Sequence, residues 1–77
     1  MTMKELVKYM AKLLVGNPDQ VEVTEVKATS SVIFELRVAR EDMGRVIGKQ
    51  GRVANAMRTL LKVAAAKQGK SAILEIV

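Results

Sequence analysis

Two glycines separated by two polar residues form the most informative segment of this chain. Residues 48–51 read Gly-Lys-Gln-Gly, and they follow the apolar Ile47 and precede Arg52. Glycine adopts unusual backbone angles and has no Cβ to hold a ligand away, so this segment, the GxxG loop, could bring its backbone close to a phosphodiester. We expect Lys49 and Gln50 to project outward as donors. A helix that begins at Arg52 would add free N–H groups and a positive dipole end.

The same four residues could also form a plain turn between two helices, because glycine is common in such turns and a GxxG sequence alone is a weak signal. The setting favours a functional loop. It lies between two predicted helices, after a predicted hairpin and in the basic half of the chain. Phosphate binding and a simple turn therefore remain the two interpretations of the pattern itself.

Catalytic residue sets are missing from the composition. The chain contains no cysteine and no histidine, which removes disulfides, thiol nucleophiles, the commonest metal ligand and the commonest general base. The segment from Gly44 to Lys49 has some likeness to a nucleotide-binding P-loop. However, Gly44 is one residue too close to Gly48, and Gln50 stands where a magnesium-binding Ser or Thr belongs. We predict a protein that is not an enzyme and has no cofactor.

Charge is divided unevenly along the chain. Residues 1–42 carry six basic and seven acidic side chains, while residues 43–77 carry seven basic side chains and only Glu75, so the halves have net charges of −1 and +6. This asymmetry is typical of a half that faces a polyanion, although solvated helix surface would explain it as well. Charged residues interrupt every apolar run, so we expect no signal peptide, no membrane span and a cytoplasmic location.

The pattern of apolar residues predicts the elements that position the GxxG loop. A helix from about Met3 to Val15 begins at a Thr2–Glu5 capping box, with Gly16 as its C-cap. A hairpin covers about Val21 to Ala39, and its first strand changes phase near Thr24–Glu25, which predicts a bulge or a twist there. The acids of residues 40–42 would start a short helix and complement its dipole, and that helix ends by Ile47.

A long helix follows the GxxG loop, then a loop at residues 67–70 and a last strand from Ser71 to Val77. The apolar arc of the long helix spans roughly 200°, wider than an ordinary surface helix requires. We therefore expect it to pack against a sheet and also against another helix or a second copy of the chain. The order α-β-β-α-α-β allows a right-handed crossover, which predicts a single α+β domain, residues 1–77, with a three-stranded mixed sheet and helices on one face.

Residues 46–53, Val-Ile-Gly-Lys-Gln-Gly-Arg-Val, resemble the core signature of the KH domain, a fold that binds RNA and single-stranded DNA. The order of elements resembles the type II, bacterial arrangement, and the whole chain is similar to the KhpA family of small single-KH proteins. That family usually has isoleucine where Val53 stands, a departure that affects only the shape of the groove.

The resemblance implies which residues contact RNA. The GxxG loop of a KH domain clamps the backbone of about four nucleotides, which assigns phosphates here to Gly48, Lys49, Gln50 and Gly51. Three apolar residues would wall the groove for the bases, although each could equally be ordinary core: Val46, Ile47 and Val53. Three further cations are candidates for phosphates or plain surface charge: Arg45, Arg52 and Lys70. Tyr9 and Phe34 are the only aromatic residues, so base contacts must be aliphatic packing and hydrogen bonds.

The resemblance also implies partners and a biological setting. Members of the KhpA family are associated with a larger KH-containing RNA-binding protein, and they are linked to RNA chaperoning, post-transcriptional control, and cell-wall and cell-length homeostasis. The alternative function is a protein-interaction scaffold that keeps the KH shape and acts in a complex with such a partner. The wide apolar arc and the small core also predict a homodimer.

Overall fold

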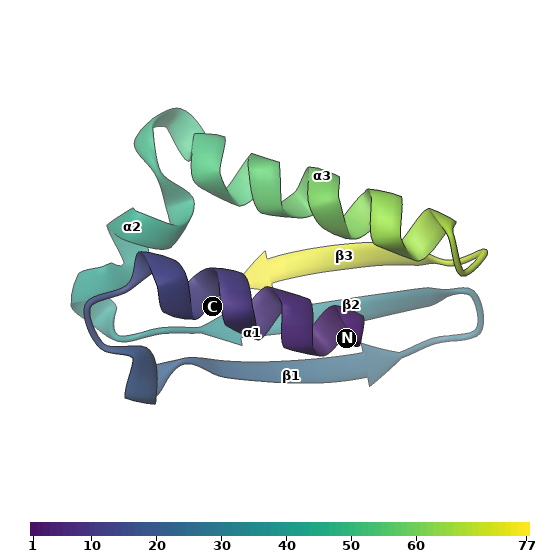
Figure 1. The fold of residues 1–77 in the computed structure, drawn as a ribbon, viewed down its shortest axis with the longest axis horizontal. Coiled ribbons are helices and arrows are strands. Elements are labelled where there is room, and N and C mark those ends of the chain that lie inside the picture. Colours follow the sequence, from purple (N-terminus) through teal and green to yellow (C-terminus); the bar gives the residue numbers. More distant parts are fainter.

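The computed structural model describes all 77 residues as one α+β unit (Figure 1). Three helices, α1 (Met3–Leu14), α2 (Met43–Ile47) and α3 (Arg52–Ala66), lie on one face of a sheet made of β1 (Glu22–Lys27), β2 (Ser31–Arg37) and β3 (Ser71–Ile76). Short 3₁₀ turns occupy residues 18–20, 40–42 and 49–51. The predicted order α-β-β-α-α-β and the one-sided layering are confirmed. None of the helices is both long and apolar enough to span a bilayer.

The sheet has the order β1-β2-β3, with β1 antiparallel and β3 parallel to the central β2. The chain passes from β2 to β3 through α2, the GxxG loop and α3, so the crossover itself carries the candidate site. The bulge predicted in the first strand is wrong, because β1 pairs with β2 without interruption from Glu22↔Arg37 to Lys27↔Val32. Val26 breaks the apolar alternation because it lies on the uncovered face of the sheet, where it is 45% exposed and opposite Ile33.

The core lies between the sheet and the three helices. In β2 the alternate residues Val32, Phe34 and Leu36 are buried, as the period of two along a strand requires when one face is covered. Val7 of α1 and Leu61 of α3 pack into the same cluster and are fully buried. Because α3 contacts both β3 and α1, the packing expected from its wide apolar arc is present.

The start of α1 forms as predicted and its end does not. The Thr2 hydroxyl accepts from the Glu5 N–H at 3.1 Å, and the Glu5 carboxylate accepts from the Thr2 N–H at 2.9 Å, completing the capping box. The second bond stabilises the ionised carboxylate and lowers the pKa of Glu5. At the other end Val15, in extended conformation, is the cap and donates to the Ala11 carbonyl. Gly16 is therefore not the cap.

Asp42 explains what Gly16 does instead. Its buried carboxylate accepts from the Gly16 and Asn17 backbone N–H groups, each at 3.0 Å, and from Asn17 Nδ2 at 2.9 Å. These bonds, led by that from Gly16, hold the pKa of Asp42 below its usual range. Asp42 lies at the start of its helix as predicted, since it is the N-cap residue of α2, but its side chain makes no cap bond there. The carboxylate instead ties the end of α1 to the start of α2.

Candidate nucleic-acid interface

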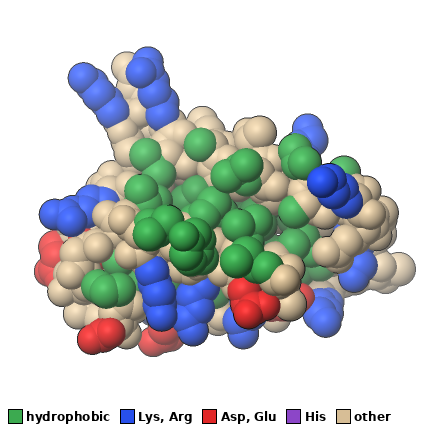
Figure 2. Space-filling model, in the orientation of Figure 1, with side chains coloured by type: hydrophobic (Ala, Val, Ile, Leu, Met, Phe, Trp, Pro, Cys, Tyr) green, Lys and Arg blue, Asp and Glu red, His purple; other side chains and the backbone are tan.

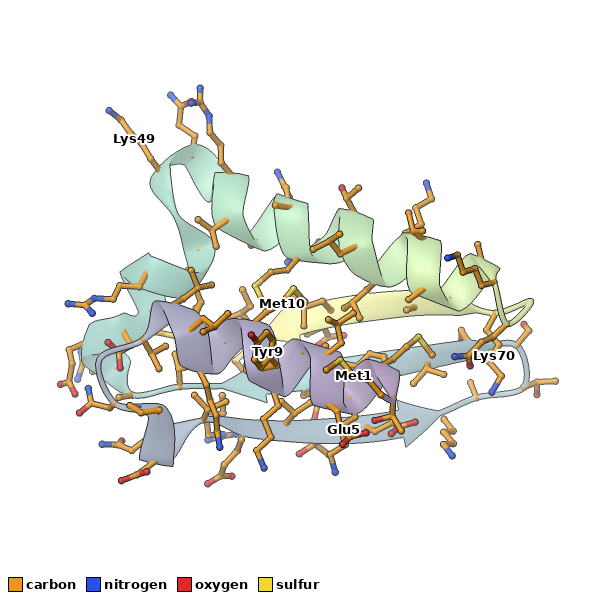
Figure 3. All side chains as sticks on the ribbon, in the orientation of Figure 1. Met1, Glu5, Tyr9, Met10, Lys49 and Lys70 are labelled. Atoms are coloured by element: carbon orange, nitrogen blue, oxygen red, sulfur yellow. The ribbon has the colours of Figure 1, made fainter.

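The GxxG loop, residues 48–51, joins α2 to α3 and protrudes from the body of the domain (Figure 3). The Gly48 N–H donates to the Gly44 carbonyl at 2.8 Å and ends α2, while the Gly51 N–H donates to the Gly48 carbonyl at 3.1 Å and closes the turn. Both glycines have positive φ, 76° at Gly48 and 74° at Gly51. The conformation therefore depends on glycine at two positions.

The two glycines are required for different reasons. A Cβ at Gly48 would lie 2.4 Å from Val53 Cγ2 and 2.8 Å from the Val53 backbone nitrogen, which real atoms do not allow. Gly48 thus lets the first turn of α3 pack directly against the end of α2. A Cβ at Gly51 would meet nothing nearer than Asn55 Nδ2, at 3.9 Å. At Gly51 only the backbone angle favours glycine.

Gln50 is the one non-glycine residue with positive φ, at φ 59° and ψ 25°. Such a left-handed conformation costs a residue with a Cβ on the order of 1–3 kcal/mol and is concentrated at functional sites. It turns the Lys49 and Gln50 side chains out to solvent, where Arg52 Nη2 donates to Gln50 Oε1 at 3.3 Å. Lys49 and Gln50 are the first residues of a 3₁₀ turn, so their backbone N–H groups have no acceptor within that turn, and neither donates to a residue outside the helices and strands. Two adjacent donors are thus free at the tip of the loop.

Positive charge surrounds these free donors. Lys49 extends away from the body, and Figures 2 and 3 show basic side chains standing clear of the surface above the loop. Arg52 begins α3, so its guanidinium lies beside the loop and the N-terminus of a 15-residue helix points toward it. An oxyanion at this position would meet backbone donors, a guanidinium, an ammonium and the positive end of a helix dipole.

The apolar candidates divide according to burial. Ile47 is 38% exposed and Val53 is half-buried, so both can wall a surface beside the GxxG loop. Val46 is 0% exposed and belongs to the core cluster, which favours ordinary core, one of the two interpretations that the sequence left open for it. Adjacent residues of a helix lie about 100° apart, so Val46 and Ile47 cannot both face the sheet.

Two of the cationic candidates lie away from the GxxG loop. Arg45 Nε is 3.8 Å from Asp42 Oδ1, so its guanidinium neighbours the buried carboxylate that ties α1 to α2. Lys70 follows α3 and lies at the opposite end of the molecule from Lys49 (Figure 3). The longest dimension of the molecule is 35 Å. Lys70 is therefore far from the loop, and the assignment of either cation to RNA stays a prediction.

A groove between α3 and β3 was not anticipated from the sequence. It encloses about 470 Å³, and its helical side is lined by Arg58, Lys62 and Ala66. Arg58 Nε donates to the Leu74 carbonyl of β3 at 3.3 Å, and its Nη1 donates to Asn55 Oδ1 at 3.2 Å. Arg58, Lys62 and Ala66 are spaced four residues apart, and this spacing, together with the expected crossover to the last strand, was the signal in the sequence that could have identified the helical side of the groove.

Comparison with known proteins places these features in a family. The sequence matches the family described as "KhpA/KhpB, KH domain" over residues 4–76. It is 61% identical over 75 residues to RNA-binding protein KhpA of Caldanaerobacter subterraneus, covering 97% of this chain and 100% of that protein. It is 55% identical to RNA-binding protein KhpA of Clostridium acetobutylicum over the same shares of both chains. For RNA-binding protein KhpA of Listeria monocytogenes the identity is 45%, over 97% of this chain and 99% of that protein.

Solved structures share the fold. A GDP·AlF4⁻-bound Era variant from Aquifex aeolicus superposes with a TM-score of 0.67 at 20% identity, over 96% of this chain and 29% of that one. Era in complex with MgGDPNP and nucleotides 1506–1542 of 16S ribosomal RNA superposes with a TM-score of 0.63 at 21% identity, over 96% and 28%. At such low identity the likeness establishes the architecture of the chain and nothing of its ligands.

Proposed function

The chain belongs to the KhpA/KhpB family of KH domains, and from that premise we propose that it binds single-stranded RNA, with the GxxG loop holding the phosphate backbone. Relatives matched along nearly their whole length carry the name RNA-binding protein. The observation that carries the proposal is the pair of unpartnered N–H groups at Lys49 and Gln50, presented on a protruding, glycine-shaped loop beside Arg52. The role is one of binding rather than catalysis.

The bases would lie beside the GxxG loop, against Ile47, Val53 and the open edge of β3. The bond from the Ser71 N–H to Ser30 turns the odd-numbered residues of β3 toward β2, so Ala72 and Leu74 direct their polar groups to the edge. Arg58 already donates to the Leu74 carbonyl there. Aliphatic walls and edge hydrogen bonds without a row of aromatic platforms predict modest affinity and loose sequence preference.

A pair of charge-matched variants tests the loop. Lys49→Asp/Gln50→Asp lowers the net charge by three and places two carboxylates at the tip, where Asp tolerates the left-handed angle of Gln50 better than most residues. We expect RNA binding to fall by at least about tenfold, because contacts are replaced by repulsion. Lys8→Asp/Gln20→Asp removes the same charge from exposed positions outside the loop and should retain binding. Unchanged RNA binding by the loop variant, with an intact circular dichroism spectrum, would refute the assignment of phosphate binding to the GxxG loop.

Salt dependence separates RNA binding from the scaffold alternative. If three to four phosphates are contacted, a slope near −0.7 per contact predicts that affinity falls about 20- to 50-fold between about 50 and 200 mM salt. A flat salt response would favour a scaffold that keeps the KH shape without clamping RNA. RNA chaperoning and a link to cell-wall and cell-length homeostasis rest on the family resemblance, and a cytoplasmic location rests on the charge pattern of the sequence; all three stay predictions.

A second role is favoured by the exposed hydrophobic face of the two long helices, defined by Tyr9 and Leu13 of α1 and Leu60 and Val63 of α3. Leu13 is 68% exposed and the other three are 53–55% exposed, and Figure 2 shows hydrophobic side chains gathered in the middle of this side. Patches of this kind mark protein contacts. We propose that this hydrophobic face binds a second copy of the chain or the KH domain of a larger partner.

Sedimentation at micromolar concentration tests the homodimer. The wild type should sediment at about twice the 8.4 kDa of the chain, and Leu13→Asp/Leu60→Asp should be monomeric because two buried carboxylates would be unpaired. Val26→Asp, which changes an apolar residue that is 45% exposed on the uncovered side of the sheet, is the control and should remain dimeric. A wild type of 8.4 kDa at every concentration would refute the dimer.

A further inference from the structure

We propose that the bound RNA continues past the GxxG loop along α3 to a distal phosphate-binding site formed by Lys62 and Lys70, and then turns over the end of the domain toward Lys27 and Lys4. This inference rests on the proposed function and extends it. The distal site would take the phosphates of nucleotides beyond the four that the loop clamps, without reading their bases.

The groove between α3 and β3 provides the track. Arg58, Lys62 and Ala66 are spaced four residues apart on α3 and line its helical side. At a rise of about 1.5 Å per residue, Lys62 lies roughly 15 Å along the helix from Arg52. Four stacked nucleotides at about 3.4 Å per residue of the strand cover about 14 Å. A strand held at the loop therefore reaches Lys62 as the four-nucleotide footprint ends.

Lys70 links this groove to a second hollow. It lines both the groove and a separate hollow of about 460 Å³ at the end of the molecule, where Lys4 and Lys27 also contribute side chains. Glu25 is the only acidic residue in that lining, and its Oε2 lies 3.9 Å from Lys27 Nζ. Three ammonium groups and one carboxylate leave the hollow cationic, which favours phosphate oxygens as its ligand.

The other exits from the groove are unfavourable for a polyanion. The uncovered face of the sheet presents Glu35 and Glu75 directly opposite each other across β2 and β3. On the other side of α3 lies the hydrophobic face, with Leu60 at 53% exposure. A strand leaving the groove meets like charge on one side and apolar surface on the other. The cationic hollow beyond Lys70 is the remaining direction.

The test compares how a short and a long RNA probe bind to the wild type and to a variant of the distal site. Oligouridines of about four and about ten nucleotides are titrated against the wild type and Lys62→Gln/Lys70→Gln, with affinity read by NMR so that millimolar dissociation constants are measurable. The variant should bind the short probe like the wild type and the long probe more weakly. Two lost contacts reduce the salt slope for the long probe by about 1.4, so its affinity change between about 50 and 200 mM shrinks roughly sevenfold.

Control variants separate the possible failures. Lys8→Gln/Lys12→Gln removes the same charge from exposed positions of α1, so it should leave both probes unaffected. In the wild type the long probe alone should shift the amides of Lys62, Lys70 and their neighbours. Equal losses for both probes, an equal loss in the α1 control, or no loss for the long probe would each overturn the distal site. Binding of neither probe by the wild type would overturn the proposed function with it.

Discussion

Replacing the two loop glycines one at a time should separate backbone strain from atomic overlap. Gly51→Ala adds a Cβ with free space around it at φ 74°, so it incurs only the cost of the left-handed angle, about 1–2 kcal/mol. Gly48 has φ 76° and ψ 172°, a region that costs about 1–3 kcal/mol outside glycine. Its new Cβ would also overlap Val53 at 2.4 Å, which adds about 1–3 kcal/mol.

The expected free-energy losses are thus about 1–2 kcal/mol for Gly51→Ala and about 2–6 kcal/mol for Gly48→Ala. A domain of this size loses roughly 4–8 °C in Tm per kcal/mol. With midpoints about 2.5 kcal/mol apart, Gly48→Ala should melt about 10–20 °C below Gly51→Ala. At the upper end, about 6 kcal/mol, the loss would exceed the whole stability of a marginally stable small domain, about 5 kcal/mol.

Thermal unfolding followed by far-UV circular dichroism measures both variants, and Gly44→Ala is the matched control. A Cβ at Gly44, inside α2, would meet no atom within 4 Å and its φ is not positive, so this change should leave the free energy of unfolding equal or raise it by up to about 1 kcal/mol, with Tm unchanged or higher. Equal Tm values for Gly48→Ala and Gly51→Ala would refute the argument that Val53 requires a glycine at position 48. A Gly44→Ala loss as large as either would refute the assignment of the effect to the loop.

Three further predictions concern the elements that support the loop. Asp42→Asn should lower Tm at pH 7. Because the pKa of Asp42 is lowered in the folded state, the ionised carboxylate stabilises the protein above the unfolded pKa near 4, and this stabilisation is lost as pH falls through the folded pKa. The difference in Tm between the wild type and Asp42→Asn should therefore close below about pH 4. A gap that stays constant from pH 7 to 3 would contradict this. Leu61→Ala, at a fully buried position, should cost about 2–5 kcal/mol in urea unfolding, whereas Leu60→Ala next to it should cost about 1 kcal/mol or less; similar losses would mean that α3 packs in another rotation. Thr2→Ala should cost about 0.5–2 kcal/mol through loss of the cap, and Thr2→Ser, which keeps the hydroxyl, should recover most of it; an unstable serine variant would argue against the capping box.

Local rules account for the parts of the fold that the sequence predicted well. The capping box of α1, the alternation of β2 and the short helix ending before Gly48 each depend on residues within a few positions of one another. The order of the elements then restricted the topology, because a crossover between β2 and β3 in one sheet is right-handed in nearly all proteins. The bulge that β1 lacks shows the limit of this reasoning, because one apolar residue on the uncovered face of the sheet, Val26, changes the phase of the pattern without interrupting the strand.

Contacts distant in sequence were the ones that the pattern could not predict. Asp42 bonds to residues 25 and 26 positions away, so nothing near it announces that it will be buried and paired rather than exposed at a helix start. Val46 and Ile47 are both apolar, and only the packing of α2 decides that the first is core and the second surface. Arg58 became a groove residue because α3 packs against β3.

The sequence by itself determined the GxxG loop, its glycine-dependent geometry and the net charge of the half-chain that surrounds it. Those properties are local or additive: backbone angles depend on the residue at each position, and charge is a sum. The packing of the helices and strands then set which charges lie beside the loop. It placed Arg52 beside the loop, Arg45 against Asp42 and Lys70 at the other end of α3, because positions in space depend on how helices and strands pack, and packing is a property of the whole chain.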